Sequence, residues 1–473
     1  MRRAILSFSH LAASLGITGL FAIGYPAEVR AQTIFCPAFF SGSSGSSGSP
    51  VALVNGSCTD RIDGAFSGAA VASQALSELS QTTTQVTTKE IGKAVVERRE
   101  QERRRRRPVR EPAREVPPEK PKPAEVTRKK PAEVTRKEPP TFPAPLPIEP
   151  AVRFGTWTQV YGDYQTRDAA GPGSLTCCIG GPLPQPTLAL NIQTRTSTVG
   201  FVAGADFSSG GLFSPIDGFI GGVTAGYTWS ELKLNTSATS TDQPLVGTGV
   251  SRLRAIASGP TAGFYATYFN AGFSSDLTVK FDFLTLDQTF NDLFATTGAY
   301  TFAATGFGVP PFISFAGAGS VSLLNSTVVG NLNYRFDLYP NFWIEPTVGV
   351  QYTNSSYGSG AAQLGLADGN LVRVQGGARF GTSTLISNRV LMTTTLTGLA
   401  YNDVQVQGGF IPVGAFQGNN LLVQADQGLM RGEGILVLNF DFGNGMSSFV
   451  LGDVYGGAHL FGGGGRGGIR YQW

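Results

Sequence analysis

Apolar and polar residues alternate along the C-terminal two thirds of the chain. Between residues 152 and 473 about twelve segments of ten or so residues show this pattern, which is the signature of transmembrane β-strands. One face of such a strand suits lipid and the other suits a wet interior. In the clearest segment, one face carries Phe342, Ile344, Pro346, Val348, Val350 and Tyr352, and the other carries Trp343, Glu345, Thr347, Gly349 and Gln351.

The lengths of the connections separate a membrane barrel from a soluble β-sandwich, whose strands also alternate. Tight periplasmic turns and long outward loops are typical of outer-membrane barrels. The sequence therefore predicts an all-β, twelve-stranded antiparallel transmembrane β-barrel, preceded by a helical segment and a Pro-rich disordered linker. Counted back from the C-terminus, the first connection, near 462–465, is short, and one at 208–217 is of middling length. The other short connections, near 443–445, 383–389, 337–341 and 270–272, alternate with long ones near 403–430, 353–370, 287–320, 236–255 and 165–193.

A helix is predicted upstream of the barrel, within segment 65–107. Ala65, Ala69, Ala72 and Leu76 begin a series of apolar residues at steps of three, four and seven, and no proline interrupts it before Pro108. The proline-rich, charged segment 108–151 that follows favours an extended polyproline II chain. At roughly 3.1 Å per residue this linker would reach well beyond 100 Å, enough to thread a pore through an outer membrane about 40 to 45 Å thick.

The first 31 residues have the order of a secretory signal peptide. Arg2 and Arg3 precede a mostly apolar stretch, and small residues lead to a predicted cleavage site between Ala31 and Gln32. The residues that follow, 32–64, form a small Gly/Ser-rich head. The mature chain is thus expected to leave the cytoplasm.

Cysteines can oxidise outside the cytoplasm. Cys36 and Cys58 bracket the Gly/Ser-rich loop of the head, and we predict a disulfide between them. Cys177 and Cys178 are adjacent, and loop thiols or cross-bonds suit them equally well. Zinc is disfavoured, because no histidine lies near either pair and the spacing fits no ligand pattern.

The composition and the charge agree with an exported β-protein. The chain has 62 glycines, 32 phenylalanines and only 15% charged residues. Its net charge of +3 conceals a strongly basic stretch, because residues 97–138 contain 16 Lys and Arg against 9 acids. No enzyme activity and no cofactor are expected. His459 is the one histidine left after signal removal, no G-x-S-x-G elbow occurs, and "GGGG" at 462–465 is interpreted as a flexible turn and not as a phosphate loop.

Several ordered segments resemble the β-domain of autotransporters, the type V secretion proteins of Gram-negative bacteria. The resemblance covers about residues 152–473. It implies a twelve-stranded barrel in the outer membrane that helps a passenger segment to reach the cell surface. The segments that carry the resemblance are "VGFVAGADF" (199–207), "DGFIGGVTAGYTWSELKL" (217–234), "GFYATYFN" (263–270), "WIEPTVGVQYT" (343–353), "VRVQGGARFGT" (372–382) and the terminal "GIRYQW".

The resemblance also implies partners, and the chain departs from the family at two points. Outer-membrane lipid, the barrel-assembly machinery and a secretion translocon are the implied partners, and Ile469, Tyr471 and Trp473 are the implied assembly signal. Only about 120 residues separate signal and barrel here, in place of the family's long passenger. In the family a helix in the pore directly precedes strand one, whereas here "PPTFPAPLPIEP" holds that position, so the sequence does not assign helix 65–107 to the pore.

Charged residues on the polar faces of the strands are predicted to face the lumen. There they either set ion selectivity or hold a threaded segment, or they pair with one another and with water. In an exported chain, anionic cell-envelope polymers, lipopolysaccharide or acidic lumen residues fit the run Arg103–Arg107 better as partners than nucleic acid does. A run of charges that is merely solvated fits better still. The predicted lumen charges are Asp206, Lys280, Asp282, Arg335, Glu345, Arg373, Arg379, Glu433, Asp441 and Arg470.

Two functions remain open from the sequence. The first is an autotransporter-like barrel that displays or translocates a short N-terminal passenger at the cell surface. The alternative is a structural or pore-forming barrel whose basic N-terminal region stays in the periplasm as a tether. Both predict an outer-membrane location with surface-exposed loops, and they differ in the side on which the N-terminal region lies.

Overall fold

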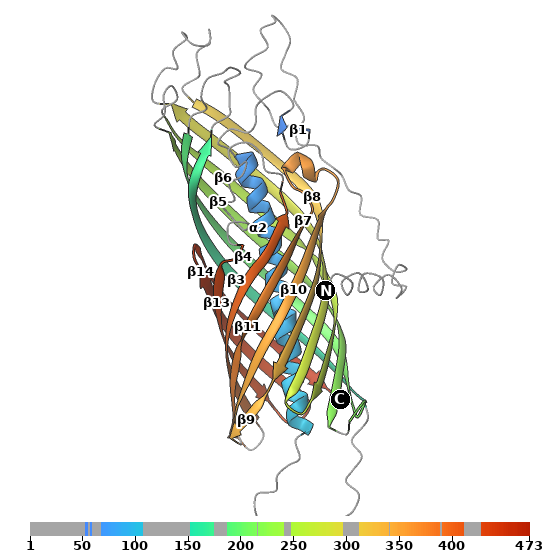
Figure 1. Cartoon of the computed structure of the whole chain (residues 1–473). Helices are drawn as coiled ribbons and strands as arrows, with labels where there is room; N and C mark the ends of the chain where they lie inside the picture. Colours follow the sequence, from blue (N-terminus) through green and yellow to red (C-terminus); the bar gives the residue numbers. More distant parts are fainter. Residues whose placement is uncertain are drawn as a thin grey trace, which may run out of the picture.

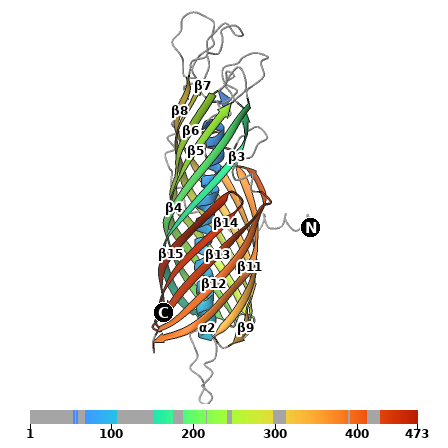
Figure 2. The same ribbon diagram turned by 90° about the vertical axis from the view of Figure 1, so that its left-hand side faces the viewer.

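Twelve long antiparallel strands close into a barrel around one helix (Figures 1 and 2). The computed structural model describes residues 53–54, 57–58, 68–106, 152–174, 187–214, 216–240, 247–296, 312–339, 341–387, 390–410 and 427–473. The strands are β3 (Val152–Ser174), β4 (Thr187–Gly210), β5 (Asp217–Ser240), β6 (Gly247–Asn270), β7 (Phe273–Thr296), β8 (Phe312–Tyr334), β10 (Phe342–Tyr357), β11 (Gly369–Ser387), β12 (Val390–Gly408), β13 (Met430–Asp441), β14 (Met446–Gly457) and β15 (Leu460–Gln472). The four-residue β9 (Phe336–Tyr339) follows β8 and also pairs with β10.

The barrel is closed by its first and last strands. The pairing of β15 with β3 runs from Leu460 opposite Arg167 to Gln472 opposite Gly155. Each remaining strand pairs with its neighbours in sequence, so no sheet edge is left among the twelve. The predicted twelve-stranded antiparallel barrel is therefore confirmed.

Most short connections lie at one end of the barrel and the long ones at the other, as the sequence predicted; the two-residue turn of Ala458 and His459 and the six-residue connection 241–246 are the short connections at the loop end. We call the end with the tight connections, such as 271–272 and 388–389, the turn end, and the other the loop end. Connections 175–186, 297–311 and 409–429 belong to the loop end, as does the β10–β11 connection with its short helix η1 (Ala361–Leu364). Because the strand number is even, both β3 and β15 have their outer termini at the turn end.

The prediction that "GGGG" forms a turn is wrong. Gly462 to Gly465 lie inside β15, and the turn before that strand consists of Ala458 and His459, with His459 at φ 65°. The first of these glycines makes room for a large ring of the neighbouring strand. A Cβ on Gly462 would lie 2.5 Å from Cζ of Tyr455, so only glycine allows this ring to cross the inner face of β15.

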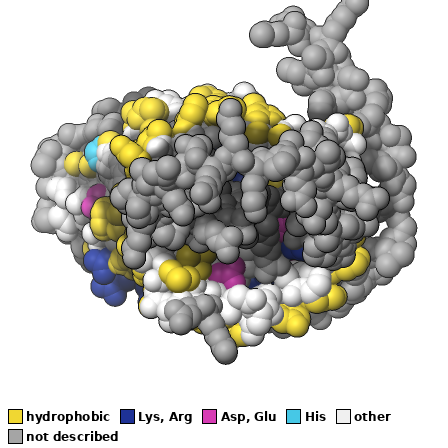
Figure 3. Space-filling model, turned by 90° about the horizontal axis from the view of Figure 1, so that it is seen from below, with side chains coloured by type: hydrophobic (Ala, Val, Ile, Leu, Met, Phe, Trp, Pro, Cys, Tyr) yellow, Lys and Arg dark blue, Asp and Glu magenta, His cyan; other side chains and the backbone are white. Residues whose placement is uncertain are grey.

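A belt of exposed apolar side chains surrounds the barrel wall, while polar side chains point inward. On β7, Leu277 and Phe283 are 44% and 45% exposed, whereas Lys280 and Asp282 are buried. The same alternation occurs on β8 and β10, as the sequence predicted. Seen from the turn end, hydrophobic side chains gather on the outer surface (Figure 3). This distribution is the reverse of that in a soluble protein and suits a lipid environment.

The alternation inverts in the parts of β4 to β8 nearest the loop end. These strands have 23 or 24 residues, whereas about 9 to 11 tilted residues span a bilayer. Beyond Trp229 on β5, Leu232 and Leu234 are buried while Lys233 is exposed. Where water surrounds the wall, polar side chains face outward and apolar side chains are buried inside. The wall of long strands therefore extends beyond the membrane at the loop end, where Figure 2 shows it as the taller side.

The predicted helix is confirmed as α2 (Gly68–Arg106), and it runs lengthwise through the barrel. Its first turns lie at the loop end, where Ser73 approaches Gly365 just after η1, and its last turns lie at the turn end. The small strands β1 (Leu53–Val54) and β2 (Ser57–Cys58) precede it, and β1 contacts η1. Among the described residues, no helix is both long and apolar enough to cross a membrane.

The last strand places its alternate residues as the sequence predicted. Ile469, Tyr471 and Trp473 are between 51% and 62% exposed, and the rings of the last two stack with centroids 5.9 Å apart. Arg470 and Gln472 are buried and point inward. The cleavage site at Ala31 and Gln32, and the cysteines Cys36, Cys177 and Cys178, lie outside the described residues.

We expect Trp473→Asp to reduce assembly of the barrel, because the ring is an outward anchor near the interface. A carboxylate on the lipid-facing side near the interface costs up to about 1 kcal/mol, or about fivefold in the ratio of folded to unfolded protein. Heat-modifiable mobility of membrane fractions measures the folded barrel. Trp473→Phe is the matched control, since it keeps an aromatic ring on the outer face at the same position. Equal assembly of the two variants would contradict the role of Trp473.

A helix held in the barrel lumen

An ionic network holds the C-terminal end of α2 at the turn end. Glu345 of β10 lies at the centre, with no exposed surface. It accepts hydrogen bonds from Nη2 of Arg99 at 2.5 Å, Nη1 of Arg103 at 2.9 Å and Nη1 of Arg379 at 2.7 Å. Arg99 also pairs with Asp276 of β7. One carboxylate of the wall thus joins two helix arginines to a third arginine on β11.

Two further ion pairs join the same helical turns to other strands. Arg98, which is fully buried, donates from Nε to Oδ1 of Asp206 on β4 at 2.7 Å, and the hydroxyl of Tyr265 donates to Oδ2 of that aspartate at 2.9 Å. Glu100 pairs with Arg335, which follows β8. Residues of β4, β7 and β10, and Arg335 after β8, all bind this part of the helix. The helix can therefore neither rotate about its own axis nor slide along the barrel without breaking these contacts.

The middle of α2 is polar but uncharged on the side that faces β7 and β8. Lys280 donates to the carbonyl of Thr84 at 3.0 Å and also contacts Oδ2 of Asp282 at 2.7 Å. Asp282 in turn accepts from Oγ1 of Thr84 at 3.0 Å, and Asn325 bonds to Ser80. Small Ser and Thr side chains let the helix approach this wall closely.

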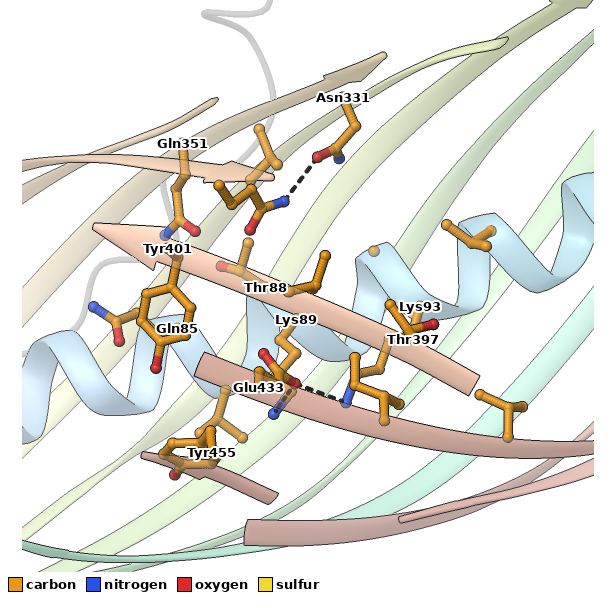
Figure 4. Close-up of a pocket in the computed structure, with 18 of the residues that line it drawn as sticks. Gln85, Thr88, Lys89, Lys93, Asn331, Gln351, Thr397, Tyr401, Glu433 and Tyr455 are labelled. Carbon is orange, nitrogen blue, oxygen red and sulfur yellow. Dashed lines mark hydrogen bonds and ion pairs between the residues drawn. The ribbon is translucent and has the colours of Figure 1, made fainter. Parts of the chain in front are cut away.

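The opposite side of the helix borders a cavity of about 190 Å³ beneath β10 to β13. Lys89 and Lys93 project from α2 toward the wall at this level (Figure 4). Lys89 lies 2.7 Å from Oε1 of Glu433, and Lys93 lies 3.0 Å from Oδ1 of Asp453, which also contacts Lys89. The helix therefore leans on β4 to β8, and the remaining space of the lumen lies along its other side, lined by both polar and apolar side chains.

Most of the predicted lumen charges contact the helix, and three do not. Asp206, Lys280, Arg335, Glu345 and Glu433 bind α2 as described above; Asp282 also does so, and Arg470 donates to the carbonyl of Ala94. Of the others, Arg379 binds Glu345, Arg373 pairs with Asp403 of β12 at 2.7 Å, and Asp441 lies at the turn-end rim and accepts from the N–H of Gly443.

Three interpretations of the N-terminal region need correction. Helix 68–106, which the sequence did not assign to the pore, fills the lumen. Arg103 is not part of a solvated run, because it is buried against Glu345. The linker need not thread the pore, since the described residues on either side of it, Arg106 and Val152, both lie at the turn end. These three errors share one cause. The partners of α2 are strands that lie far away in the sequence, so no local pattern reveals them.

Sequence reasoning missed several residues that hold the helix. Asp276 and Asp453 lie on the inward phase of their strands, and Arg466 donates to Glu97 at 2.7 Å and to the carbonyl of Glu90 at 2.9 Å. The alternation along β7, β14 and β15 was a usable signal for these three. For Arg98 and Arg99 of α2 no such signal existed, because charges surround them in the sequence.

Known proteins resemble this chain in structure only. No family model and no curated protein matches it. Among solved structures, the β-domain of the Bordetella autotransporter BrkA is 15% identical with a TM-score of 0.38, covering 67% of this chain and 98% of that one. The transport unit of the autotransporter AIDA-I from Escherichia coli is 12% identical with a TM-score of 0.34, covering 67% of this chain and 90% of that one. A Pseudomonas aeruginosa FadL homologue is 9% identical with a TM-score of 0.31, covering 68% of this chain and 90% of that one. Because these identities and scores are low, function is argued from the geometry of this chain.

Proposed function

We propose that the protein is an outer-membrane barrel of the autotransporter type that holds a short N-terminal passenger at the cell surface. The observation that carries this proposal is the direction of α2, whose N-terminus lies at the loop end and whose C-terminus lies at the turn end. In barrels of this class tight turns face the periplasm and loops face outward. The residues that precede α2 would then lie outside the cell.

The filled lumen supports a permanent anchor. At least four strands bind the last turns of α2 through ion pairs that are almost fully buried, and such pairs are costly to break singly. The helix would therefore stay in place after the passenger has crossed, with lipid around the belt and the assembly machinery acting on β15. Linker 108–151 would lie on the periplasmic side, joining α2 to β3.

Epitope tags test this arrangement in intact cells. One tag is inserted after Gly48 in the head, a second after Pro118 in the linker, and a third after Gly418 in the β12–β13 connection. Antibody should label the first and third tags on intact cells, and the second only after the outer membrane is permeabilised.

The control outcomes separate the two functions left open by the sequence. Labelling of the third tag shows that the barrel has inserted and that its loop end faces outward. If the head tag then stays protected while the third is labelled, surface display is wrong and a periplasmic tether takes its place.

A further inference from the structure

A row of basic side chains crosses the outer face of the barrel near the loop end. Arg195 of β4 lies directly opposite Lys233 of β5, and Lys233 lies directly opposite Arg254 of β6. All three point outward, and Arg252 adds a fourth exposed cation two residues further along β6. We call Arg195, Lys233 and Arg254 the basic row.

The basic row is only partly neutralised. Glu231 contacts Arg254 at 2.6 Å and Lys233 at 3.6 Å, yet these two cationic side chains remain 58% and 62% exposed. Arg195 donates to the neutral amide oxygen of Gln193 at 3.3 Å. Asp168 and Asp287 are exposed on the flanking strands. Like charges directly opposite on neighbouring strands destabilise a sheet, so the row is unfavourable in the barrel alone.

The position of the row relative to the belt indicates its ligand. Along β5, Tyr227 lies at the edge of the apolar belt, and Trp229 is the next outward-facing residue. Lys233 is the second outward-facing residue after Trp229. Four residues along a strand rise about 13 Å, or about 10 Å along the membrane normal at the usual tilt. Tryptophan and tyrosine sit at the boundary of headgroups and tails. The cations therefore lie at the level of the headgroups and just beyond them.

We propose that the basic row binds the phosphate groups of the glycolipid of the outer leaflet, lipopolysaccharide. This inference rests on the proposed function, because the orientation proposed there places the loop end at the outer leaflet. Guanidinium and ammonium groups are phosphate ligands, and three of them side by side match a headgroup with more than one phosphate. Bound phosphate also removes the repulsion within the row.

Binding of lipopolysaccharide to the purified full chain tests the site. The protein is studied in a zwitterionic detergent without divalent cations, and lipopolysaccharide is titrated against thermal unfolding. In the triple variant Arg195→Gln, Lys233→Gln, Arg254→Gln we expect the affinity to fall on the order of 100-fold, because each cation near an anionic surface contributes about fivefold. Without lipid the triple variant should unfold at the same temperature as the parent or higher.

A matched variant should change the affinity for lipopolysaccharide in the opposite direction. Glu231→Gln removes the carboxylate within the row, and the affinity should rise about fivefold. The site is refuted if the triple variant binds as tightly as the parent, if dephosphorylated lipopolysaccharide binds equally well, or if phosphatidylglycerol binds as tightly as lipopolysaccharide. The titration does not depend on orientation in the cell, so its failure leaves surface display intact, and a reversed tag result leaves the binding result intact.

Discussion

In a Glu345→Ala variant, the C-terminal half of α2 should lose its hold in the lumen, and the free energy of unfolding should fall by about 3 to 5 kcal/mol. Glu345 is fully buried and accepts from Arg99, Arg103 and Arg379. Removing its carboxylate leaves three guanidinium groups close together, with Asp276 and the more distant Glu100 as acid partners of Arg99. Urea unfolding of the protein in lipid vesicles measures the loss.

The same variant should change the conductance of the barrel. A loosened helix frees part of the lumen beside the cavity of about 190 Å³, so we expect larger and noisier currents in planar bilayers than for the parent. Glu231→Ala is the control, because its carboxylate lies on the outer face with exposed partners and should contribute less than about 1 kcal/mol. Unchanged stability and unchanged conductance for Glu345→Ala would show that the ionic network does not retain α2.

An arginine within the apolar belt should destabilise the barrel far more than an arginine beyond it. Val328 faces outward on β8 between Leu324 and Leu332, and Val328→Arg should cost about 2 to 4 kcal/mol in lipid. Ser320 faces outward on the same strand beyond the belt, opposite Asp287 of β7, and Ser320→Arg should change the free energy of unfolding by less than about 0.5 kcal/mol. Unfolding in vesicles compares the two, and equal costs would contradict the membrane boundary drawn from the inverted alternation.

The strands and their faces follow from the sequence because the signal for them is local. Each side chain of β7, β8 or β10 has its direction set by the period of two, and the lipid on one side and the wet lumen on the other select the residue types. The lengths of the connections predicted that turns gather at one end of the barrel and long loops at the other. The same local pattern misplaced one turn, because in "GGGG" no side chain is present to show an alternation, and the ring of Tyr455, which explains Gly462, is seen only in the folded barrel.

The position of α2 is decided by the tertiary structure. Val86, Ile91, Ala94 and Val95 of α2 cluster with buried apolar side chains of the wall. The many Ser, Thr, Gln and charged residues of the helix interrupt the one-sided apolar pattern that identifies a packed helix, because polar side chains of the wall bind much of the rest of its surface. Arg98 and Arg99 find their acids on β4, β7 and β10, more than 100 residues away in the chain. The sequence by itself thus determined the barrel, its lipid face and the existence of the helix. Only the closing of the barrel, which brings those acids together around one axis, decided that the helix lies inside and which end of it lies at the loop end.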